Sequence, residues 1–179
     1  RRGAVAAVVE RVLDAPVPQL VVTDGRAGGA LAAHVVLGSP SDRLFLVGVT
    51  GTNGKTTTAL VIRHLMATRE PAAAVGTLGV VDGSGVRPGT DGLTTPGPVQ
   101  VANWLRKLAD DGMRTVVMEA SSHALEQRRL DGVRFAAGVF TRSITPISAP
   151  RSRSKEGLDE SGRVRRQARD SRIQASRNG

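Results

Sequence analysis

The sequence contains no cysteine, and its aromatic side chains amount to three Phe and one Trp in 179 residues. Without cysteine, neither a disulfide framework nor a Cys-type zinc site can form, which fits a reducing cytosol. No apolar run approaches the roughly 20 residues of a membrane-spanning helix, and no signal peptide is visible. We therefore expect a cytoplasmic protein with no membrane partner, whose core consists of small aliphatic side chains.

Acidic residues are outnumbered by basic ones, which gives a formal net charge of +9. Residues 142–179 hold ten Lys and Arg against four Asp and Glu, whereas residues 1–141 hold fifteen against twelve. Since the first part is nearly balanced and aromatic side chains for base stacking are scarce, we expect no specific nucleic-acid partner. A nucleic-acid-binding protein is a hypothesis that rests on the basic C-terminal segment alone.

A glycine-rich stretch, Val47–Thr58 (VGVTGTNGKTTT), has the layout of a nucleotide phosphate loop. The apolar run 44–49 predicts a buried parallel strand before it, and a helical run follows over 55–68. Glycines let backbone N–H groups approach phosphate closely, and the start of a helix adds positive partial charge. Lys55 would reach the β- and γ-phosphates, and the Thr56 hydroxyl would bind Mg²⁺. Because valine replaces the first glycine of the full pattern, the alternative is a glycine-rich turn before an ordinary helix.

Between residues 44 and 141 the chain alternates between strand and helix patterns. Strands are predicted at 44–49, 72–78, 115–118 and 135–140. Helices are predicted at 55–68 and 99–111, with a short helix or turn at 121–129 and a loop or hairpin at 80–92. This alternation predicts an α/β fold with a doubly wound parallel sheet. The phosphate loop, Thr94-Thr95 and Glu119–His123 follow predicted strands, so they should gather at one edge of that sheet.

The two ends of the chain differ from this pattern. Residues 1–42 hold two apolar segments and then a helix over 30–37 that Thr23 or Asp24 could cap, which is too little for a domain. Residues 142–179 hold nine Arg and seven Ser but few apolar side chains, so burial cannot offset the entropy of ordering them, and we expect disorder. The chain begins with Arg1 rather than Met. We expect a fragment, and a monomer.

Polar side chains outside the phosphate loop are further candidates for chemistry. Glu119 ends an apolar strand, where it would either hold Mg²⁺ opposite the loop or be a surface carboxylate. Ser121 and His123 are too close in sequence to face each other, and no nucleophile-elbow motif is present, so we favour polar substrate contacts over hydrolase chemistry. Thr94-Thr95 could bind substrate or cap a helix. The run 127–129 (Gln-Arg-Arg) could grip an anionic substrate or be solvated helix surface.

Several motifs resemble those of a known family. Residues 51–57 (GTNGKTT) look like the ATP loop of the Mur ligases, which use ATP to form amide bonds in peptidoglycan precursors. Further motifs resemble the tripeptide synthetases of that family, which add the third residue of the stem peptide: 76–79 (GTLG), 93–96 (LTTP) and 118–125 (MEASSHAL). The likeness continues to Thr141. The loop alone would also suit cyanophycin synthetase, folylpolyglutamate synthetase or another Mur ligase.

The resemblance implies the fold of the P-loop Mur ligase central domain and an ATP-dependent amide-bond ligase that uses Mg²⁺. ATP would phosphorylate the D-glutamate side-chain carboxylate of UDP-MurNAc-L-Ala-D-Glu, and the amine of diaminopimelate or lysine would then displace phosphate. Lys55 and Glu119 would be catalytic, and Thr56 and Glu119 would bind the metal. The ATP site would consist of Gly51, Thr52, Asn53, Gly54, Lys55, Thr56 and Thr57. The UDP-MurNAc-dipeptide would contact Thr94, Thr95, Ser121, Gln127 and Arg129.

The sequence departs from the family after Thr141. The resemblance implies an Asn next, then an Asp-His-Leu-Asp stretch with a metal-binding His, and later a carbamylated lysine, but Arg142 and Ser-Ile-Thr-Pro stand here instead. We expect residues 1–42 to be a remnant of an N-terminal UDP-binding domain with its linker, and 43–141 a partial ATP-binding central domain. Residues 142–179 would be a basic tail of the kind that a reading-frame shift produces. Such a chain is expected to be an inactive fragment, or an ATP-binding module without catalysis.

Overall fold

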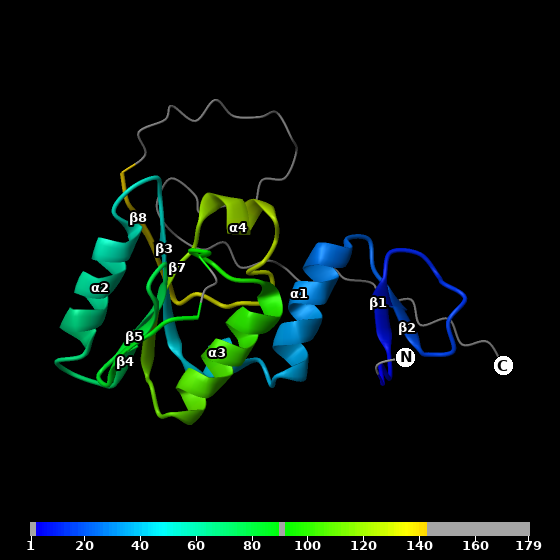
Figure 1. Cartoon of the computed structure of the whole chain (residues 1–179), viewed down its shortest axis with the longest axis horizontal. Helices are drawn as coiled ribbons and strands as arrows, with labels where there is room; N and C mark the ends of the chain where they lie inside the picture. Colours follow the sequence, from blue (N-terminus) through cyan, green and yellow to red (C-terminus); the bar gives the residue numbers. More distant parts are fainter. Residues whose placement is uncertain (1–2, 90–91, 143–179) are drawn as a thin grey trace.

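The computed structural model describes residues 3–89 and 92–142 (Figure 1). The strands are β1 (Ala7–Val9), β2 (Gln19–Val21), β3 (Phe45–Thr50), β4 (Ala72–Gly76), β5 (Gly79–Asp82), β6 (Gly85–Arg87), β7 (Thr115–Glu119) and β8 (Ala137–Phe140). The helices are α1 (Gly25–Val36), α2 (Lys55–Met66), α3 (Pro98–Asp110) and α4 (Ser122–Glu126), with a 3₁₀ turn η1 (Pro40–Arg43). No helix within these ranges is long and apolar enough to cross a membrane.

The main sheet orders its strands β6-β5-β4-β7-β3-β8. Strands β4, β7, β3 and β8 run parallel, which confirms the predicted parallel α/β sheet. Strands β5 and β6 form an antiparallel hairpin that extends the edge next to β4, so the stretch expected to be a loop or hairpin is a hairpin. The register pairs Val49 with Glu119 and Thr50 with Phe140. The carboxyl ends of β3, β7 and β8 therefore meet at one edge of the sheet.

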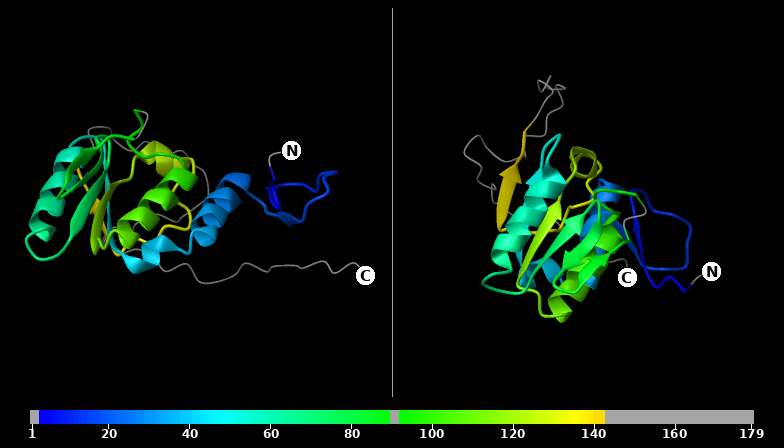
Figure 2. Two further views of the ribbon diagram at one scale, coloured as in Figure 1. Left: turned by 60° about the horizontal axis from the view of Figure 1, so that its bottom comes forward. Right: turned by 60° about the vertical axis from the view of Figure 1, so that its left-hand side comes forward.

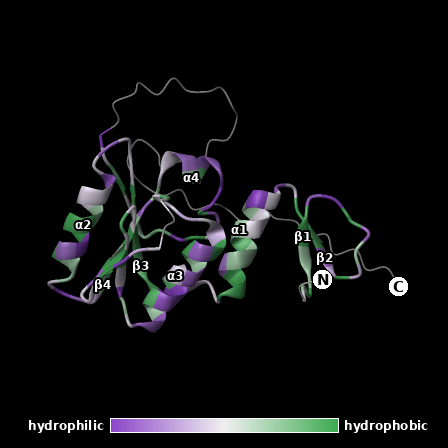
Figure 3. Ribbon diagram, viewed as in Figure 1, coloured by the Kyte–Doolittle hydropathy of each residue, from purple (hydrophilic) through white to green (hydrophobic). Residues whose placement is uncertain are grey.

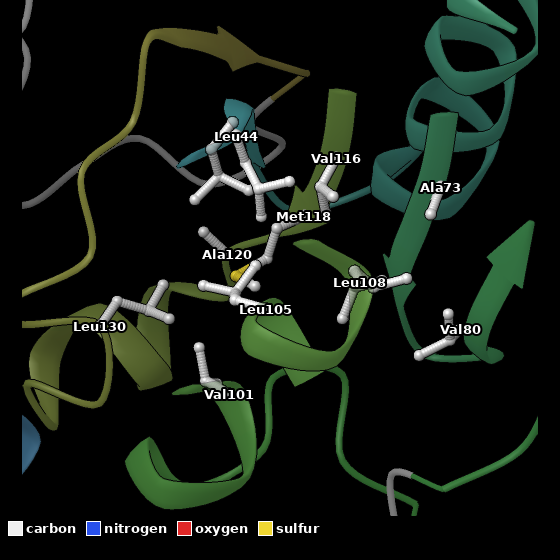
Figure 4. Close-up of a cluster of buried hydrophobic side chains, with 12 residues drawn as sticks. Leu44, Ala73, Val80, Val101, Leu105, Leu108, Val116, Met118, Ala120 and Leu130 are labelled. Carbon is white, nitrogen blue, oxygen red and sulfur yellow. The ribbon is translucent and has the colours of Figure 1, made fainter. Parts of the chain in front are cut away.

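Helix α2 covers one face of this sheet and α3 covers the other, with α1 packed against α3 (Figures 1 and 2). In β7, Val116 and Met118 join the hydrophobic cluster under α3, whereas Val117 joins the cluster under α2. Successive side chains of a strand point to opposite faces, so β7 is buried on both sides. This double burial is why the strand is continuously apolar in sequence. Figure 4 shows the larger cluster, in which side chains of α3 are directed toward those of β7.

Small aliphatic side chains make up the core, as the scarcity of aromatic residues predicted. The buried hydrophobic residues are Ala, Val and Leu together with Met118. Trp104 and Phe135 are only partly buried and pack against the margin of the larger cluster. Apolar residues concentrate in the strands, and the helices carry hydrophilic residues interspersed with apolar ones (Figure 3). Packing of the sheet between helices, rather than ring stacking, therefore holds the site in place.

Strands β1 and β2 form a separate two-stranded parallel sheet beyond α1, at one end of the described chain (Figure 1). The carboxylate of Asp24 caps α1, because it accepts hydrogen bonds from the N–H groups of Arg26 (2.9 Å) and Ala27 (3.0 Å). The predicted cap is confirmed, and α1 runs from Gly25 to Val36, which includes most of the expected helical body at 30–37. Gly28 lies within this helix, where a Cβ would be 2.9 Å from the Val22 side chain. A glycine that is poor for an isolated helix thus lets α1 pack closely on β1 and its neighbours.

Two expectations about the ends of the chain remain predictions. The disordered basic tail falls on residues 142–179, of which 143–179 lie outside the described residues. The assignment of residues 1–42 to a UDP-binding domain rests on the sequence resemblance alone.

Candidate nucleotide and metal site

The glycine-rich loop, residues 51–54, connects β3 to α2 as predicted. Gly51 (φ 130°) and Gly54 (φ 83°) have backbone conformations that favour glycine. Lys55 is half-buried, and its Nζ turns back to donate to the carbonyl oxygens of Gly51 (2.9 Å) and Thr52 (3.2 Å). The ammonium group that was predicted to reach phosphate therefore lies against the loop itself.

Backbone N–H groups at the start of α2 are available to an anion. The Thr58 N–H donates to the carbonyl oxygen of Gly54 (2.9 Å). The preceding amides, from Asn53 to Thr57, have no hydrogen-bond acceptor within the part of the chain that the structure describes. Unpaired N–H groups at the start of a twelve-residue helix, beside a lysine ammonium group, suit a phosphate group.

Glu119 is the last residue of β7, and its side chain is directed into the protein. The residue is 2% exposed, so the alternative of a surface carboxylate is wrong. Its Oε2 accepts hydrogen bonds from the hydroxyls of Thr56 (3.0 Å) and Thr77 (3.2 Å), and its Oε1 accepts one from the Thr77 N–H (3.0 Å). The structure thus brings together Thr56 and Glu119, the two residues that the sequence predicts as metal ligands.

Gly76, at the end of β4, leaves the space that the Glu119 carboxylate occupies. A Cβ at residue 76 would lie 2.0 Å from Oε1 of Glu119, which is far inside van der Waals contact. The backbone of β4 therefore approaches the carboxylate directly, and the following residue, Thr77, provides two of its hydrogen bonds. A residue with any side chain at position 76 would push the carboxylate away from Thr56.

The surroundings of the Glu119 carboxylate leave its negative charge available to a cation. All three hydrogen bonds to its carboxylate come from neutral groups, and among the described residues no Lys or Arg forms an ion pair with it. Buried charges in proteins are usually paired or bound to a metal, and Mg²⁺ is commonly held by one or two carboxylates together with phosphate oxygens and water. No group of three or more His, Asp or Glu lies together in the described ranges. A single carboxylate and a Thr hydroxyl beside unpaired loop amides match the magnesium arrangement more closely than a protein-only metal cage.

A second set of residues lies on the other side of Glu119. The buried hydroxyl of Thr95 donates to the carbonyl oxygen of Glu119 (2.8 Å) and accepts from the N–H of Ser121 (3.1 Å). Arg129 donates to the carbonyl oxygen of Thr95 (2.8 Å) and to the side-chain oxygen of Gln127. Four of the five predicted substrate residues are therefore joined by one hydrogen-bonded network adjoining the end of β7.

Thr94, the fifth predicted substrate residue, lies beside Thr77, and their hydroxyls are 3.2 Å apart. The alternative that Thr94 or Thr95 caps a helix is wrong. Gly97 is the N-cap of α3 and no side chain caps that helix. Thr95 instead belongs to the network around Arg129. Thr94 contacts the Thr77 hydroxyl, which donates to the carboxylate of Glu119.

The serine hydrolase arrangement is absent from the described residues. Ser121 caps α4, where its hydroxyl accepts from the N–H of Ala124 (3.2 Å), and His123 is exposed and bonds to Gln127. Arg128 also turns away from the network, since it forms ion pairs with Asp24 and Asp131. Hydrogen bonding by the Ala27 amide holds the pKa of Asp24 below its usual value, whereas burial raises the pKa of Asp131.

Sequence reasoning missed three residues of this site. Gly76 and Thr77 carried part of the family resemblance but received no role, and Thr141 was noted only as the point where the likeness stops. Each ends or follows a parallel strand, and that position was the available signal. Their contacts with Glu119 and the loop depend on strand order, which the sequence did not specify.

Other proteins resemble this chain over most of its length. A family model described as the Mur ligase middle domain matches residues 49–146. A UDP-N-acetylmuramoyl-L-alanyl-D-glutamate–2,6-diaminopimelate ligase of Geobacter metallireducens is 46% identical over 143 residues, and one of Mesorhizobium japonicum is 47% identical over 148. A solved structure of a ligase with the same name superposes with a TM-score of 0.64 at 30% identity.

These similarities cover unequal shares of the proteins compared. The two relatives match 78% and 79% of this chain but only 28% and 29% of their own lengths. The solved structure matches 89% of this chain and 31% of its own. The chain therefore spans less than a third of the length of the curated relatives it matches.

Proposed function

The chain belongs to the Mur ligase family, and we propose on that basis that loop 51–57 and Glu119 bind Mg·ATP for amide-bond formation. The reaction would join an amino acid to UDP-MurNAc-L-Ala-D-Glu in peptidoglycan precursor synthesis. The relatives' names favour 2,6-diaminopimelate over lysine as that amino acid, and they argue against cyanophycin and folylpolyglutamate synthesis. The reaction needs ATP, which agrees with the predicted cytoplasmic location.

The first chemical step would transfer the γ-phosphoryl group of ATP to the D-glutamate side-chain carboxylate, releasing ADP. Lys55 and the amides from Asn53 to Thr57 would stabilise the charge on the transferred group. Thr56 and Glu119 would hold Mg²⁺, which neutralises charge on the phosphate oxygens when bound. The amine of the incoming amino acid would then attack the acyl carbon, so that the C–N bond forms as the C–O bond to phosphate breaks and the amine loses a proton.

Substrate positioning would fall to the network around Thr95. Arg129 and Gln127 offer a cation and an amide to the anionic UDP-MurNAc-dipeptide, with Thr94 and Ser121 beside them. The backbone bond between Thr95 and Glu119 would couple the position of this substrate to the metal ligand. Proximity of this kind matters because the carboxylate and the γ-phosphate have to meet in line.

Ligation would be a property of the complete enzyme, whereas the printed chain would bind nucleotide without turnover. The printed sequence has no histidine after His123. The metal-binding His that the family resemblance implies beyond Thr141 therefore has no counterpart in it, and the single lysine beyond Thr141, Lys155, stands where the sequence departs from the family. The alternative is that the same site belongs to an ATP-binding module whose function does not include catalysis.

The observation that carries the proposal is the 3.0 Å hydrogen bond between the Thr56 hydroxyl and Glu119. It brings a residue of the phosphate loop against a buried carboxylate from a different strand. Calorimetric titration of the chain with Mg·ATP, with ATP in EDTA and with AMP is the test. We expect binding of Mg·ATP, weaker binding without metal and none of AMP, which lacks the β- and γ-phosphates. Equal binding of AMP and Mg·ATP, or no binding of either, would contradict the proposal.

A further inference from the structure

We propose that Thr141, which directly follows β8, is a positioning residue that holds the phosphate loop in its binding shape. The inference rests on the function proposed above, but its central contact is independent of any ligand. The Thr141 hydroxyl lies 2.6 Å from the carbonyl oxygen of Asn53 and 3.1 Å from that of Thr50. One hydroxyl proton serves one acceptor at a time, and the shorter distance assigns it to Asn53.

Backbone contacts fix Thr141 at this position. Its N–H donates to the carbonyl oxygen of Thr50 (2.8 Å), which continues the β3–β8 ladder past the end of both strands. The next residue, Arg142, accepts from the N–H of Thr52 (3.3 Å). The end of β8 is therefore bonded to the residue before the loop and to two residues within it.

Three consecutive loop carbonyls are held by two side chains. Lys55 occupies those of Gly51 and Thr52, and Thr141 occupies that of Asn53. The described residues contain no cis peptide bond, and in a trans peptide the C=O and the following N–H point in opposite directions. Holding the Asn53 carbonyl on β8 therefore directs the Gly54 N–H away from β8, as one of the amides left for phosphate.

The glycine at position 51 makes this contact possible. A Cβ built on Gly51 would lie 2.2 Å from the Thr141 hydroxyl oxygen and 2.9 Å from the Thr141 carbonyl oxygen. No side chain fits between the loop and the end of β8, so the two backbones are in direct contact. Gly51 thus meets two requirements, its positive φ and this close approach.

Thr141 and Lys55 differ in what they do when nucleotide binds. In the proposed function the Lys55 ammonium group also serves the β- and γ-phosphates, so its three donors are shared between the loop and the ligand. Thr141 has a single proton, which the loop carbonyl takes. It would keep the loop in shape while Lys55 engages phosphate.

The test compares Thr141→Val, which removes the hydroxyl at constant shape, with Thr141→Ser, which keeps it. Thr68→Val is the matched control, since the Thr68 hydroxyl also donates to a backbone carbonyl, that of Leu65 (2.7 Å), just beyond the far end of α2. Hydrogen–deuterium exchange of the Thr52 N–H without nucleotide measures how firmly the loop is held on the end of β8, and calorimetry with Mg·ATP measures affinity. Circular dichroism melts check that each variant folds.

We expect exchange of the Thr52 N–H, which is bonded to Arg142, to be about tenfold faster in Thr141→Val. Mg·ATP affinity should fall about three- to tenfold, the loss of one hydrogen bond. Thr141→Ser and Thr68→Val should resemble the wild type in both measurements. Unchanged exchange in Thr141→Val, or an equal change in Thr68→Val, would overturn the positioning role. If the wild type binds no nucleotide, the proposed function fails, and the exchange experiment still decides the role of Thr141.

Discussion

Glu119 illustrates how a single residue depends on its neighbours. A carboxylate that is 2% exposed with only neutral donors is costly to bury, and its three hydrogen bonds from Thr56 and Thr77 offset part of that cost. A bound cation would offset the rest. At the residue scale, the functional tests therefore concern the groups whose charge the site needs, Glu119 and Lys55.

Replacing Lys55 by alanine should severely weaken Mg·ATP binding and leave the fold. The substitution deletes the ammonium group and its bonds to the carbonyls of Gly51 and Thr52, and we expect a loss of about 100-fold in affinity. Lys107→Ala is the control, because Lys107 pairs with Asp111 on the exposed side of α3 (3.0 Å). Calorimetric titration is the measurement, and unchanged affinity in the Lys55 variant would contradict the assignment of Lys55 to phosphate binding.

Replacing Glu119 by glutamine should weaken metal binding more than metal-free nucleotide binding. The amide keeps the shape of the side chain but lacks the charge that would hold Mg²⁺. Glu70→Gln is the control, since Glu70 also accepts a bond from a threonine hydroxyl, that of Thr115 at the opposite end of β7. Titration with Mn²⁺ followed by electron paramagnetic resonance measures the effect. Equal Mn²⁺ affinity in the wild type and the Glu119 variant would show that the carboxylate binds no metal.

At the scale of elements, the ends of the strands position the groups of the site. Strand β4 places Gly76 against Glu119, and β8 places Thr141 against the loop. On the other side of the sheet, His34 of α1 bonds through Nε2 to the Ser41 hydroxyl of η1 (2.7 Å), which in turn accepts from the N–H of Arg134 (3.1 Å). The hydrogen bonds among His34, Ser41 and Arg134 therefore connect α1 to the segment that leads into β8.

Replacing Gly76 by alanine should disturb β4 and the metal site together. The added methyl group would overlap the Glu119 carboxylate, and we expect the free energy of unfolding to fall by about 1–3 kcal/mol, as for other overpacked sites. Mn²⁺ affinity should also fall, because the carboxylate is displaced from Thr56. Gly83→Ala is the control, since a Cβ there meets nothing within 4 Å. Denaturant unfolding and Mn²⁺ titration measure both effects, and wild-type values for both would contradict the prediction.

The junction at His34 should make stability depend on pH. Burial lowers the pKa of His34 below the usual 6.5, assisted by Arg134 and opposed by Asp42. As the pH falls below 6.5 the unfolded chain therefore binds a proton before the folded chain does, so stability present above pH 6.5 is lost on the acid side. Unfolding midpoints at pH 7.5 and 5.5 should differ for the wild type and for His64→Gln, an exposed control. The difference should shrink in His34→Gln, and an undiminished difference there would assign the effect to another group.

At the scale of the whole molecule, binding and turnover should separate. We expect the printed chain to bind Mg·ATP yet release no phosphate when given UDP-MurNAc-L-Ala-D-Glu and diaminopimelate or lysine. The reason is that groups which the family resemblance places beyond Thr141 are missing from its sequence, and loss of one such electrostatic contact typically lowers the rate about 10²–10³-fold. A phosphate-release assay with a full-length relative as the positive control measures this. A rate of phosphate release near that of the full-length relative would contradict the prediction.

The sequence by itself determined the features that are local along the chain. The glycine-rich loop, the helix after it and the parallel strands follow from glycine placement and apolar periodicity, which act over a few residues. Glu119 was predicted to hold Mg²⁺ because it ends an apolar strand, and that role stays a prediction. The capping of α1 by Asp24 was also visible, since a cap and its helix are neighbours in sequence.

Only the tertiary structure decided which distant residues meet. The burial of Glu119, its bonds to Thr56 and Thr77, and the contact between Thr141 and the loop depend on the order β4-β7-β3-β8. Strand order arises from packing of the whole sheet between α2 and α3, and no local pattern specifies it. The glycine inside α1 has the same origin, because Gly28 fits the close contact with Val22 although glycine is a poor helix former.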